Sequence, residues 1–158
     1  MNNMELRFNA SLINEAFARM SVISFITPLN PSLDEISEVK TIVSEAVSNA
    51  IIHGYRLDAS KEVVIKASID KDSLTLTISD YGVGIENIEQ ALKPSFTTRP
   101  DLERAGMGLT IIRTLSDEFA IRSVIGMGTK ITIKKIFSKE PTLVYEREDN
   151  WRRINYKS

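Results

Sequence analysis

Two polar side chains, Glu45 and Asn49, stand four residues apart in a stretch whose apolar residues recur with helical spacing. Residues four apart lie on the same face of an α-helix, one turn from each other. The neutral amide oxygen of Asn49 suits Mg²⁺, which keeps several waters and takes its remaining ligands largely from phosphate oxygens. Phosphoryl transfer also requires a group that orients the attacking hydroxyl and accepts its proton. Glu45 fits that role, so the pair predicts phosphoryl-transfer chemistry.

An aspartate and two glycines follow a pair of strand-like segments. Apolar and polar side chains alternate over 62–69 and 73–79, which is the pattern of a β-hairpin, and Asp80 follows directly. A carboxylate at this position can accept the exocyclic N–H of adenine and so select the base. Gly82 and Gly84 lack Cβ, which lets the backbone approach a flat purine. The segment predicts an adenine-binding site, and its ordinary alternative is a solvated turn.

A long polar loop over 93–106 ends in a glycine. Loops of that length usually carry function. Gly106 and Gly108 mark the point where the loop becomes a helix over 107–117. The free N–H groups and the positive dipole end of a helix N-terminus bind phosphate. We therefore expect the loop to be a lid over a nucleotide.

The lid contains cations and hydroxyls that could reach the phosphates. Its arginines are Arg99 and Arg104, and a planar guanidinium suits phosphate oxygens better than an ammonium group does. Arg104 stands two residues before Gly106 and is the better candidate for the γ-phosphate. Thr97 and Thr98 could add hydroxyl donors.

Two further features have weaker functional interpretations. Gly126 and Gly128 flank Met127 between two strand-like segments, and the freedom of glycine at positive φ predicts a tight strand connection there. Thr129, which follows, could either contact the nucleotide or serve only the sheet.

His53 is the only histidine, and its place at a helix end is explained by packing or by the helix dipole. We assign it no catalytic role.

Periodicity predicts the elements that must position these residues. We expect Ser11 to cap the first helix and Gly54 to end the second. The order of elements predicts an α+β fold, with helices on one face of a mixed, largely antiparallel sheet. One domain should span 1–137, followed by a charged extension over 138–158. The predicted elements are a strand over 4–8, helices over 11–26 and 32–53, the hairpin, a short helix over 85–92, the helix over 107–117, and strands over 118–125 and 129–137.

Composition limits the class of protein. The chain has 158 residues, and 42% of them are hydrophobic, which is enough for a single core. A formal net charge of −1 provides no general basic field for nucleic acid. The absence of cysteine fits a reducing compartment. The N-terminus lacks the pattern of a signal peptide, and no apolar stretch has the length of a membrane span. We expect a cytoplasmic protein that binds neither nucleic acid nor membrane.

In order and spacing, the segments 45–49, 80–84, 106–108 and 126–129 resemble the N, G1, G2 and G3 boxes of the Bergerat ATP-binding fold. That fold is shared by gyrase, Hsp90, histidine kinases and MutL. Longer stretches closely resemble the anti-sigma-F factors of sporulating bacteria. These stretches are SEAVSNAIIHGY (44–55), DYGVGI (80–85) and FTTRPDLERAGMGL (96–109). The resemblance covers roughly residues 4–137, and the continuation of this chain to Ser158 departs from it.

The resemblance implies a homodimeric serine protein kinase that binds and inactivates a sporulation sigma factor (sigma-F) while it holds ATP and Mg²⁺. Such a protein also phosphorylates a serine of a small anti-anti-sigma protein. In this reading Glu45 is the catalytic base and Asn49 the magnesium ligand. Asp80 is the adenine contact and Arg104 the lid arginine.

The same resemblance places partner contacts on the first helix, where this chain has Glu15 and Arg19. We expect these side chains on the exposed face of that helix, away from the ATP pocket. Met4, Leu6 and Phe8 line one face of a terminal strand whose edge a second subunit could cover.

Two alternatives stay open. The anti-sigma-B type of switch kinase shares the four boxes. A nucleotide-gated module could instead hold a sigma factor without phosphotransfer. Glu45 favours a kinase over such a module, because a module has no need of a base beside the metal. A sensor histidine kinase is disfavoured, because fewer than fifty residues precede Asn49 and a phosphorylatable helical hairpin needs more.

Overall fold

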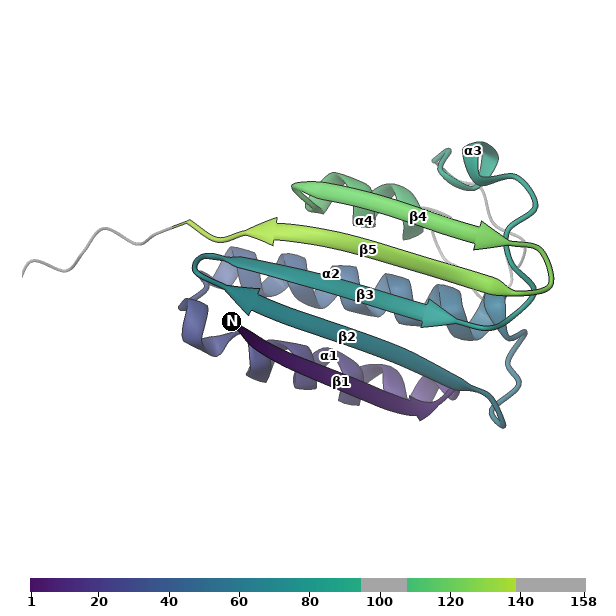
Figure 1. Cartoon of the computed structure of the whole chain (residues 1–158), viewed down its shortest axis with the longest axis horizontal. Helices are drawn as coiled ribbons and strands as arrows, with labels where there is room; N and C mark the ends of the chain where they lie inside the picture. The colour runs from purple at the N-terminus through teal and green to yellow at the C-terminus, as the bar shows by residue number, and fades with distance from the viewer. Residues whose placement is uncertain (95–107, 139–158) are drawn as a thin grey trace, which may run out of the picture.

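The computed structural model describes residues 1–94 and 108–138, which form a five-stranded sheet with helices on one face (Figure 1). The strand order is β1-β2-β3-β5-β4. The α+β fold class predicted from the sequence is confirmed. The elements are β1 (Asn2–Asn9), α1 (Glu15–Phe25), α2 (Leu33–Asn49), β2 (Glu62–Asp70), β3 (Ser73–Asp80), α3 (Ile88–Ala91), α4 (Gly108–Leu115), β4 (Glu118–Val124) and β5 (Gly128–Ile136).

Neighbouring strands run antiparallel in all four pairs of this sheet. The expectation of a mixed sheet is therefore corrected to a fully antiparallel one over the described strands. The cause is the connectivity. Short turns join β2 to β3 and β4 to β5, and the segment through α4 enters the sheet at its far edge, so that β5 returns beside β3 in the opposite direction. Lys71 in the β2–β3 turn has a φ of 54°, as a tight hairpin requires.

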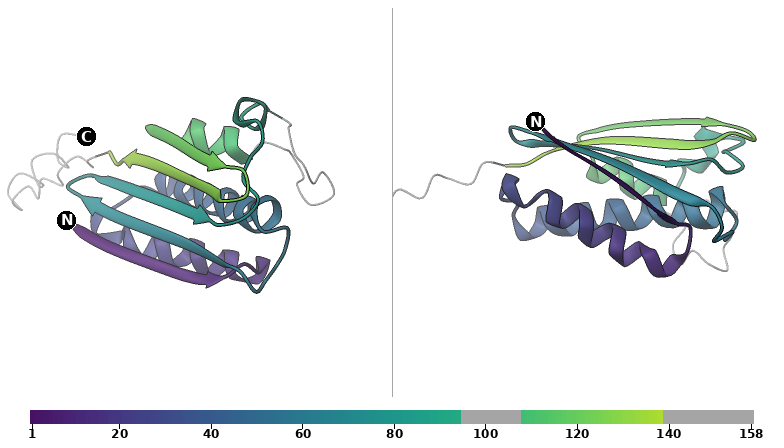
Figure 2. Two further views of the ribbon diagram at one scale, coloured as in Figure 1. Left: turned by 45° about the vertical axis from the view of Figure 1, so that its right-hand side comes forward. Right: turned by 60° about the horizontal axis from the view of Figure 1, so that its bottom comes forward.

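The core lies between the sheet and the helices α1, α2 and α4, which Figure 2 shows together on one side of the strands. Alternate residues of the central strands face this layer, and Ile65, Ile78 and Ile133 are buried there. On the opposite side, α2 contributes a buried stripe at helical spacing. Its members are Val39, Ile42, Val43, Ala46 and Val47. This buried stripe packs α2 against the sheet.

Helix α2 begins at a capping box. The Ser32 hydroxyl accepts the Glu35 N–H at 3.2 Å, and the Glu35 carboxylate accepts the Ser32 N–H at 2.9 Å. The α-helix ends at Asn49, and a π-helical turn, Ala50–Gly54, follows it. The predicted helix over 32–53 is confirmed in extent, but its last turn is wound more widely than an α-helix.

The start of the first helix differs from the prediction. Ser11 makes no side-chain cap, and a 3₁₀ turn, Leu12–Asn14, precedes α1. The backbone explains the difference, because the Asn14 N–H donates to the Ser11 carbonyl at 2.9 Å and closes this tighter turn first.

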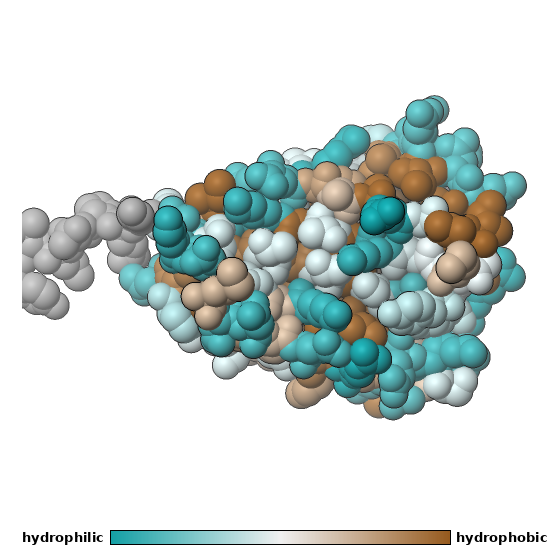
Figure 3. All heavy atoms as spheres, in the orientation of Figure 1, coloured by the Kyte–Doolittle hydropathy of each residue, from teal (hydrophilic) through white to brown (hydrophobic). Residues whose placement is uncertain are grey.

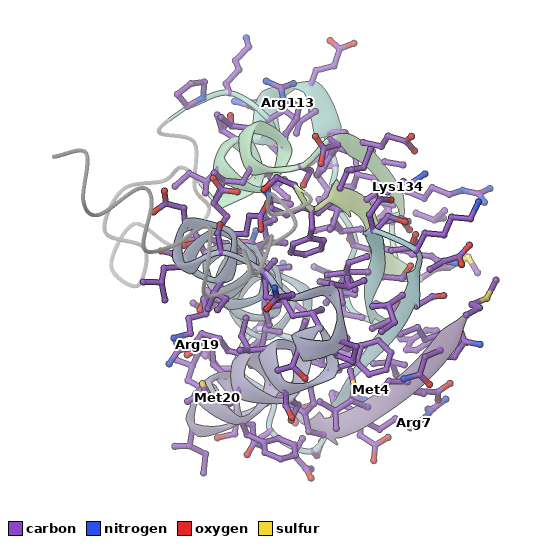
Figure 4. All side chains as sticks on the ribbon, turned by 90° about the vertical axis from the view of Figure 1, so that its left-hand side faces the viewer. Met4, Arg7, Arg19, Met20, Arg113 and Lys134 are labelled. Carbon is purple, nitrogen blue, oxygen red and sulfur yellow. The ribbon has the colours of Figure 1, made fainter. Side chains whose placement is uncertain are left out.

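Strand β1 forms one edge of the sheet. Phe8 is buried in the core, and Met4 and Leu6 pack against it. These side chains therefore face the core, with Met4 and Leu6 only partly buried, and the backbone edge of β1 has no neighbouring strand among the described residues. Figure 4 shows Arg7 and Lys134 pointing away from the helix layer, on the bare face of the sheet.

The bare face of the sheet is largely hydrophilic (Figure 3), and hydrophobic surface gathers at the end where β4 turns into β5. Val124, Ile125 and Met127 are exposed at this turn. Among the described residues, no helix is long and apolar enough to cross a membrane.

Candidate nucleotide-binding site

A pocket opens between α2 and α4, beside the end of β3 and the start of β5. Most of its wall is apolar, from Ala46, Ala50, Ile78, Ile85, Leu109 and Ile131. Its polar groups include Asn49, Asp80 and Thr129. A pocket with apolar walls and a few convergent polar groups suits a flat base that must be held in one orientation.

Asp80 is the last residue of β3, and only 7% of its surface is exposed. Burial raises the pKa of its carboxyl from 3.8 to about 6, while N–H donation from Gly82 and Thr129 acts in the opposite direction. The Gly82 N–H lies 3.0 Å from Asp80 Oδ1. Since ionised carboxylates only accept hydrogen bonds, Asp80 can select a base that presents an amino group.

Three glycines allow the backbone to crowd around Asp80. A Cβ on Gly54 would lie 2.6 Å from the Asp80 carboxyl, and one on Gly128 would lie 2.0 Å from the Asp80 carbonyl oxygen. A Cβ on Gly82 would lie 1.9 Å from the Gly54 carbonyl oxygen. The structure thus gives Gly82 a packing reason beyond the approach to a purine that the sequence suggested. Gly84 has a φ of 78° and belongs to the pocket wall.

Glu45 and Asn49 meet the start of α4. A Cβ on Gly108 would lie 3.0 Å from both Glu45 Oε2 and Asn49 Nδ2, so the two side chains of α2 pack closely against the start of α4. The two side chains stand one turn apart on α2, as the spacing predicted. The structure therefore brings the predicted base, the predicted metal ligand and the N-terminal end of α4 together.

The donor set fits Mg²⁺ bound mainly through a nucleotide. Among the described residues no group of three or more His, Cys, Asp or Glu side chains could hold a metal ion. Mg²⁺ in phosphate-transfer sites needs only one or two protein oxygens, because phosphates and waters supply the rest. The Asn49 amide, beside the Glu45 carboxylate, provides such an oxygen.

The remaining predicted nucleotide contacts divide into two groups. Thr129 is buried in the pocket wall, and its hydroxyl shares a 2.8 Å hydrogen bond with the Ser123 hydroxyl. The lid candidates lie outside the described residues. They are Thr97, Thr98, Arg99, Arg104 and Gly106.

Two residues beside the predicted boxes were missed. Gly54 touches Asp80, and the Tyr55 hydroxyl accepts the Tyr81 N–H at 2.8 Å. His53 lines the same pocket. The sequence signals for Gly54 and Tyr55 were their place at the end of the helix that carries Asn49 and their inclusion in the stretch 44–55, but neither signal indicated a contact with the Asp80 segment.

Glu15 and Arg19 lie on α1, on the side of the molecule opposite the bare sheet face, where Figure 4 shows Arg19. Arg19 is half-buried, and its Nη1 lies 3.1 Å from Glu15 Oε1 and 3.2 Å from the Ser44 hydroxyl. The Ser44 hydroxyl also donates to Glu15. Neither residue lines the pocket, but both side chains are partly buried, so the expectation of an exposed pair is corrected in that respect. The pair joins α1 to α2 one residue before Glu45, because Ser44 offers a hydroxyl to both charges.

The fold and the site define an ATPase of the histidine kinase-like class. The sequence profile of the histidine kinase-like ATPase domain matches residues 8–135. Among solved structures, the chain resembles the RsbU and RsbW domains of Rv1364c from Mycobacterium tuberculosis, with a TM-score of 0.64. The match covers 92% of this chain and 35% of that one at 16% identity, so it supports the fold alone.

Within this class the chain belongs to the anti-sigma F factor family. It is 51% identical to the anti-sigma F factor of Clostridium perfringens (strain SM101 / Type A) over 134 residues, 85% of this chain and 96% of that protein. The anti-sigma F factor of Clostridium beijerinckii is 50% identical over 87% of this chain and 96% of its own length. That of Geobacillus sp. (strain WCH70) is 49% identical over 90% of this chain and 97% of its own length.

Proposed function

We propose that this protein is an ATP-dependent serine protein kinase and anti-sigma factor. It would bind and inhibit a sporulation sigma factor of the F type and phosphorylate an anti-anti-sigma protein on serine. One observation carries the proposal: Glu45 and Asn49 converge on Gly108 at the pocket that contains the buried Asp80. The names of the relatives, all anti-sigma F factors, support the choice of partner.

In this proposal the residues of the pocket have separate tasks. Asp80 accepts the adenine amino group, and the apolar walls cover the faces of the base. Asn49 supplies an oxygen to Mg²⁺, which, when bound, neutralises charge on the phosphates. The N-terminal end of α4, at Gly108, adds N–H groups and the positive end of the helix dipole.

Glu45 distinguishes a kinase from a pure binding module. It stands one turn before Asn49 and beside Gly108, near the place where the transferred phosphate would lie. There its carboxylate can orient the serine hydroxyl and take its proton as the serine oxygen bonds to the γ-phosphorus of ATP. The bond from that phosphorus to the β,γ-bridging oxygen breaks in the same transfer, and ADP leaves. A module that only holds a sigma factor would not require this group.

The outer surface of α1 supports a protein partner. Phe17 and Met20 are exposed on α1, the helix that carries Glu15 and Arg19, and Ile13 is exposed on the 3₁₀ turn that precedes it. Apolar side chains around a charged pair are typical of protein interfaces. We place the sigma-factor contact on this face, and we expect the protein to be a homodimer that acts in the cytoplasm, without direct contact to nucleic acid or membrane.

The test compares Glu45→Gln with wild type in single-turnover transfer from labelled ATP to the anti-anti-sigma protein. The substitution keeps the size of the side chain and removes its basicity, so transfer should slow by about 10²–10⁴ while ATP and sigma-factor affinity stay unchanged. Glu118→Gln, which removes an exposed carboxylate on β4, is the matched control.

The outcomes separate the alternatives. A rate of phosphoryl transfer in Glu45→Gln within a few fold of the wild-type rate would mean that Glu45 is not the catalytic base. Sigma-factor binding without any transfer by wild type would favour the nucleotide-gated module. Preferential binding of a B-type sigma factor would favour the anti-sigma-B type of kinase.

A further inference from the structure

The hydroxyl of Tyr55 joins the start of β2 to the residue that follows β3, next to the pocket residue Asp80. It donates to the Glu62 carbonyl oxygen at the start of β2, at 2.5 Å, and accepts the Tyr81 N–H at 2.8 Å. The side chain is buried, with 7% of its surface exposed. Both of its hydrogen bonds are to backbone groups, so the hydroxyl fixes the path of the chain beyond what the ring packing provides.

The peptide unit that Tyr55 holds is the one that follows Asp80. Its N–H belongs to Tyr81, and its carbonyl oxygen is packed against Gly128, where a Cβ would approach to 2.0 Å. The next N–H, of Gly82, donates to the Asp80 carboxylate at 3.0 Å. The orientation of that carboxylate therefore depends on a peptide plane that is held from both sides.

The backbone on both sides of Tyr55 adopts uncommon conformations. The π-helical turn Ala50–Gly54 closes with a hydrogen bond from the Tyr55 N–H to the Ala50 carbonyl, at 2.8 Å. Arg56 and Leu57 follow with φ values of 52° and 66°, in the left-handed region that residues other than glycine seldom occupy. Wide turns and left-handed residues concentrate at functional sites.

We propose that Tyr55 is a positioning residue for base recognition, whose hydroxyl holds the backbone after Asp80 and so aims the Asp80 carboxylate at the adenine amino group. The inference rests on the proposed adenine contact of Asp80. Burial, and to a smaller extent the charge of Asp80, raise the pKa of Tyr55, so its hydroxyl keeps its proton and its donor role at neutral pH.

The experiment compares two ligands that differ only in the group to be recognised, ATP and purine riboside triphosphate, which lacks the amino group. Their affinities are measured for wild type and Tyr55→Phe. The variant retains the ring and loses both hydrogen bonds. We expect ATP affinity to fall about five- to tenfold, the size of one net hydrogen bond. Affinity for purine riboside triphosphate should stay within about twofold, because that ligand gains nothing from an aimed carboxylate.

Thr77→Val is the matched control, because it removes a hydroxyl from β3 whose hydrogen bond, to Thr132, lies away from the pocket. It should leave both affinities unchanged. Urea unfolding of each variant reports any change in global stability. A Tyr55→Phe protein that is folded and keeps the wild-type preference for ATP would overturn the proposal.

A second measurement does not depend on nucleotide. The Tyr81 amide should exchange its hydrogen slowly in wild type and at least about tenfold faster in Tyr55→Phe. A freely exchanging Tyr81 amide in the wild type would refute the positioning role even if the variant did not fold. If wild type fails to prefer ATP over purine riboside triphosphate while the Tyr81 amide is protected, the adenine role of Asp80 fails and the backbone restraint stands.

Discussion

The affinity for ATP should depend on the ionisation of Asp80. The carboxyl titrates with a pKa of about 6, because burial disfavours its charged form. Only the charged form makes the stronger, charge-assisted hydrogen bond to an amino group. Lowering the pH through 6 should therefore weaken ATP binding, in a range where an exposed carboxyl would already be fully ionised.

The size of the effect follows from the ionised fraction. With a pKa of about 6, roughly 90% of the carboxyl is ionised at pH 7 and roughly 10% at pH 5. If binding requires the ionised form, ATP affinity should fall about tenfold between these values. With an ordinary aspartate pKa, the change over the same range would be less than about 10%.

The assay is equilibrium binding of ATP and of purine riboside triphosphate between pH 5 and pH 8. The terminal phosphate of both nucleotides titrates near pH 6, so its contribution cancels in the ratio of the two affinities. The ratio isolates the amino group and its carboxylate partner. Asp80→Asn provides a second control, because its side chain does not ionise and its ratio should be flat with pH.

Two results would refute this reasoning. A ratio that is constant from pH 5 to pH 8 in wild type would mean that the charge of Asp80 plays no part in recognition. A ratio that rises as the pH falls would mean that the protonated carboxyl is the better partner, donating to a ring nitrogen of the base instead of accepting from the amino group.

Three further predictions follow from the same geometry. Asn49→Ala should abolish phosphotransfer and the Mg²⁺ dependence of ATP affinity, and normal activity in a magnesium titration would remove the metal assignment. Arg19→Ala should weaken sigma-factor binding in pull-down or titration while ATP affinity stays unchanged, because Arg19 does not line the pocket. Gly54→Ala should prevent ATP binding in calorimetry, because its Cβ would lie 2.6 Å from the Asp80 carboxyl, and wild-type affinity would show that the pocket can relax.

The parts of the fold that the sequence predicted well depend on local signals. Helix α2 has a capping box between Ser32 and Glu35, three positions apart, and a stripe of apolar residues at helical spacing. The β2–β3 hairpin has two alternating strands around a short turn that contains Lys71. Each signal lies within a short segment of the chain. It can therefore be recognised without knowledge of what packs against that segment. Ser11 shows the limit, because a serine before a helix did not reveal that a 3₁₀ turn would form first.

The site was predictable as far as it depends on residue type. Asp80, Asn49 and Glu45 carry groups that nucleotide chemistry requires, and their distances along the chain matched elements that could present them. The lid residues stay a prediction. Periodicity gave no information about the contact of Gly54 with Asp80, or about the link from Arg19 to Ser44, because both join segments 25 or more residues apart.

The burial of Asp80 gives ATP binding and folding stability opposite dependences on pH. A folded-state pKa of about 6, raised from 3.8, means that the folded protein binds more protons than the unfolded chain in this range. The contribution of Asp80 to the free energy of unfolding should therefore decrease by up to about 3 kcal/mol as the pH rises from about 4 to above 6. Over the same range ATP affinity should increase, because the ionised carboxylate is the form that recognises adenine. Asp80 therefore contributes least to the stability of the nucleotide-free protein at the pH values where it binds ATP best. The adenine amino group adds a hydrogen bond to those that the buried carboxylate accepts from Gly82 and Thr129.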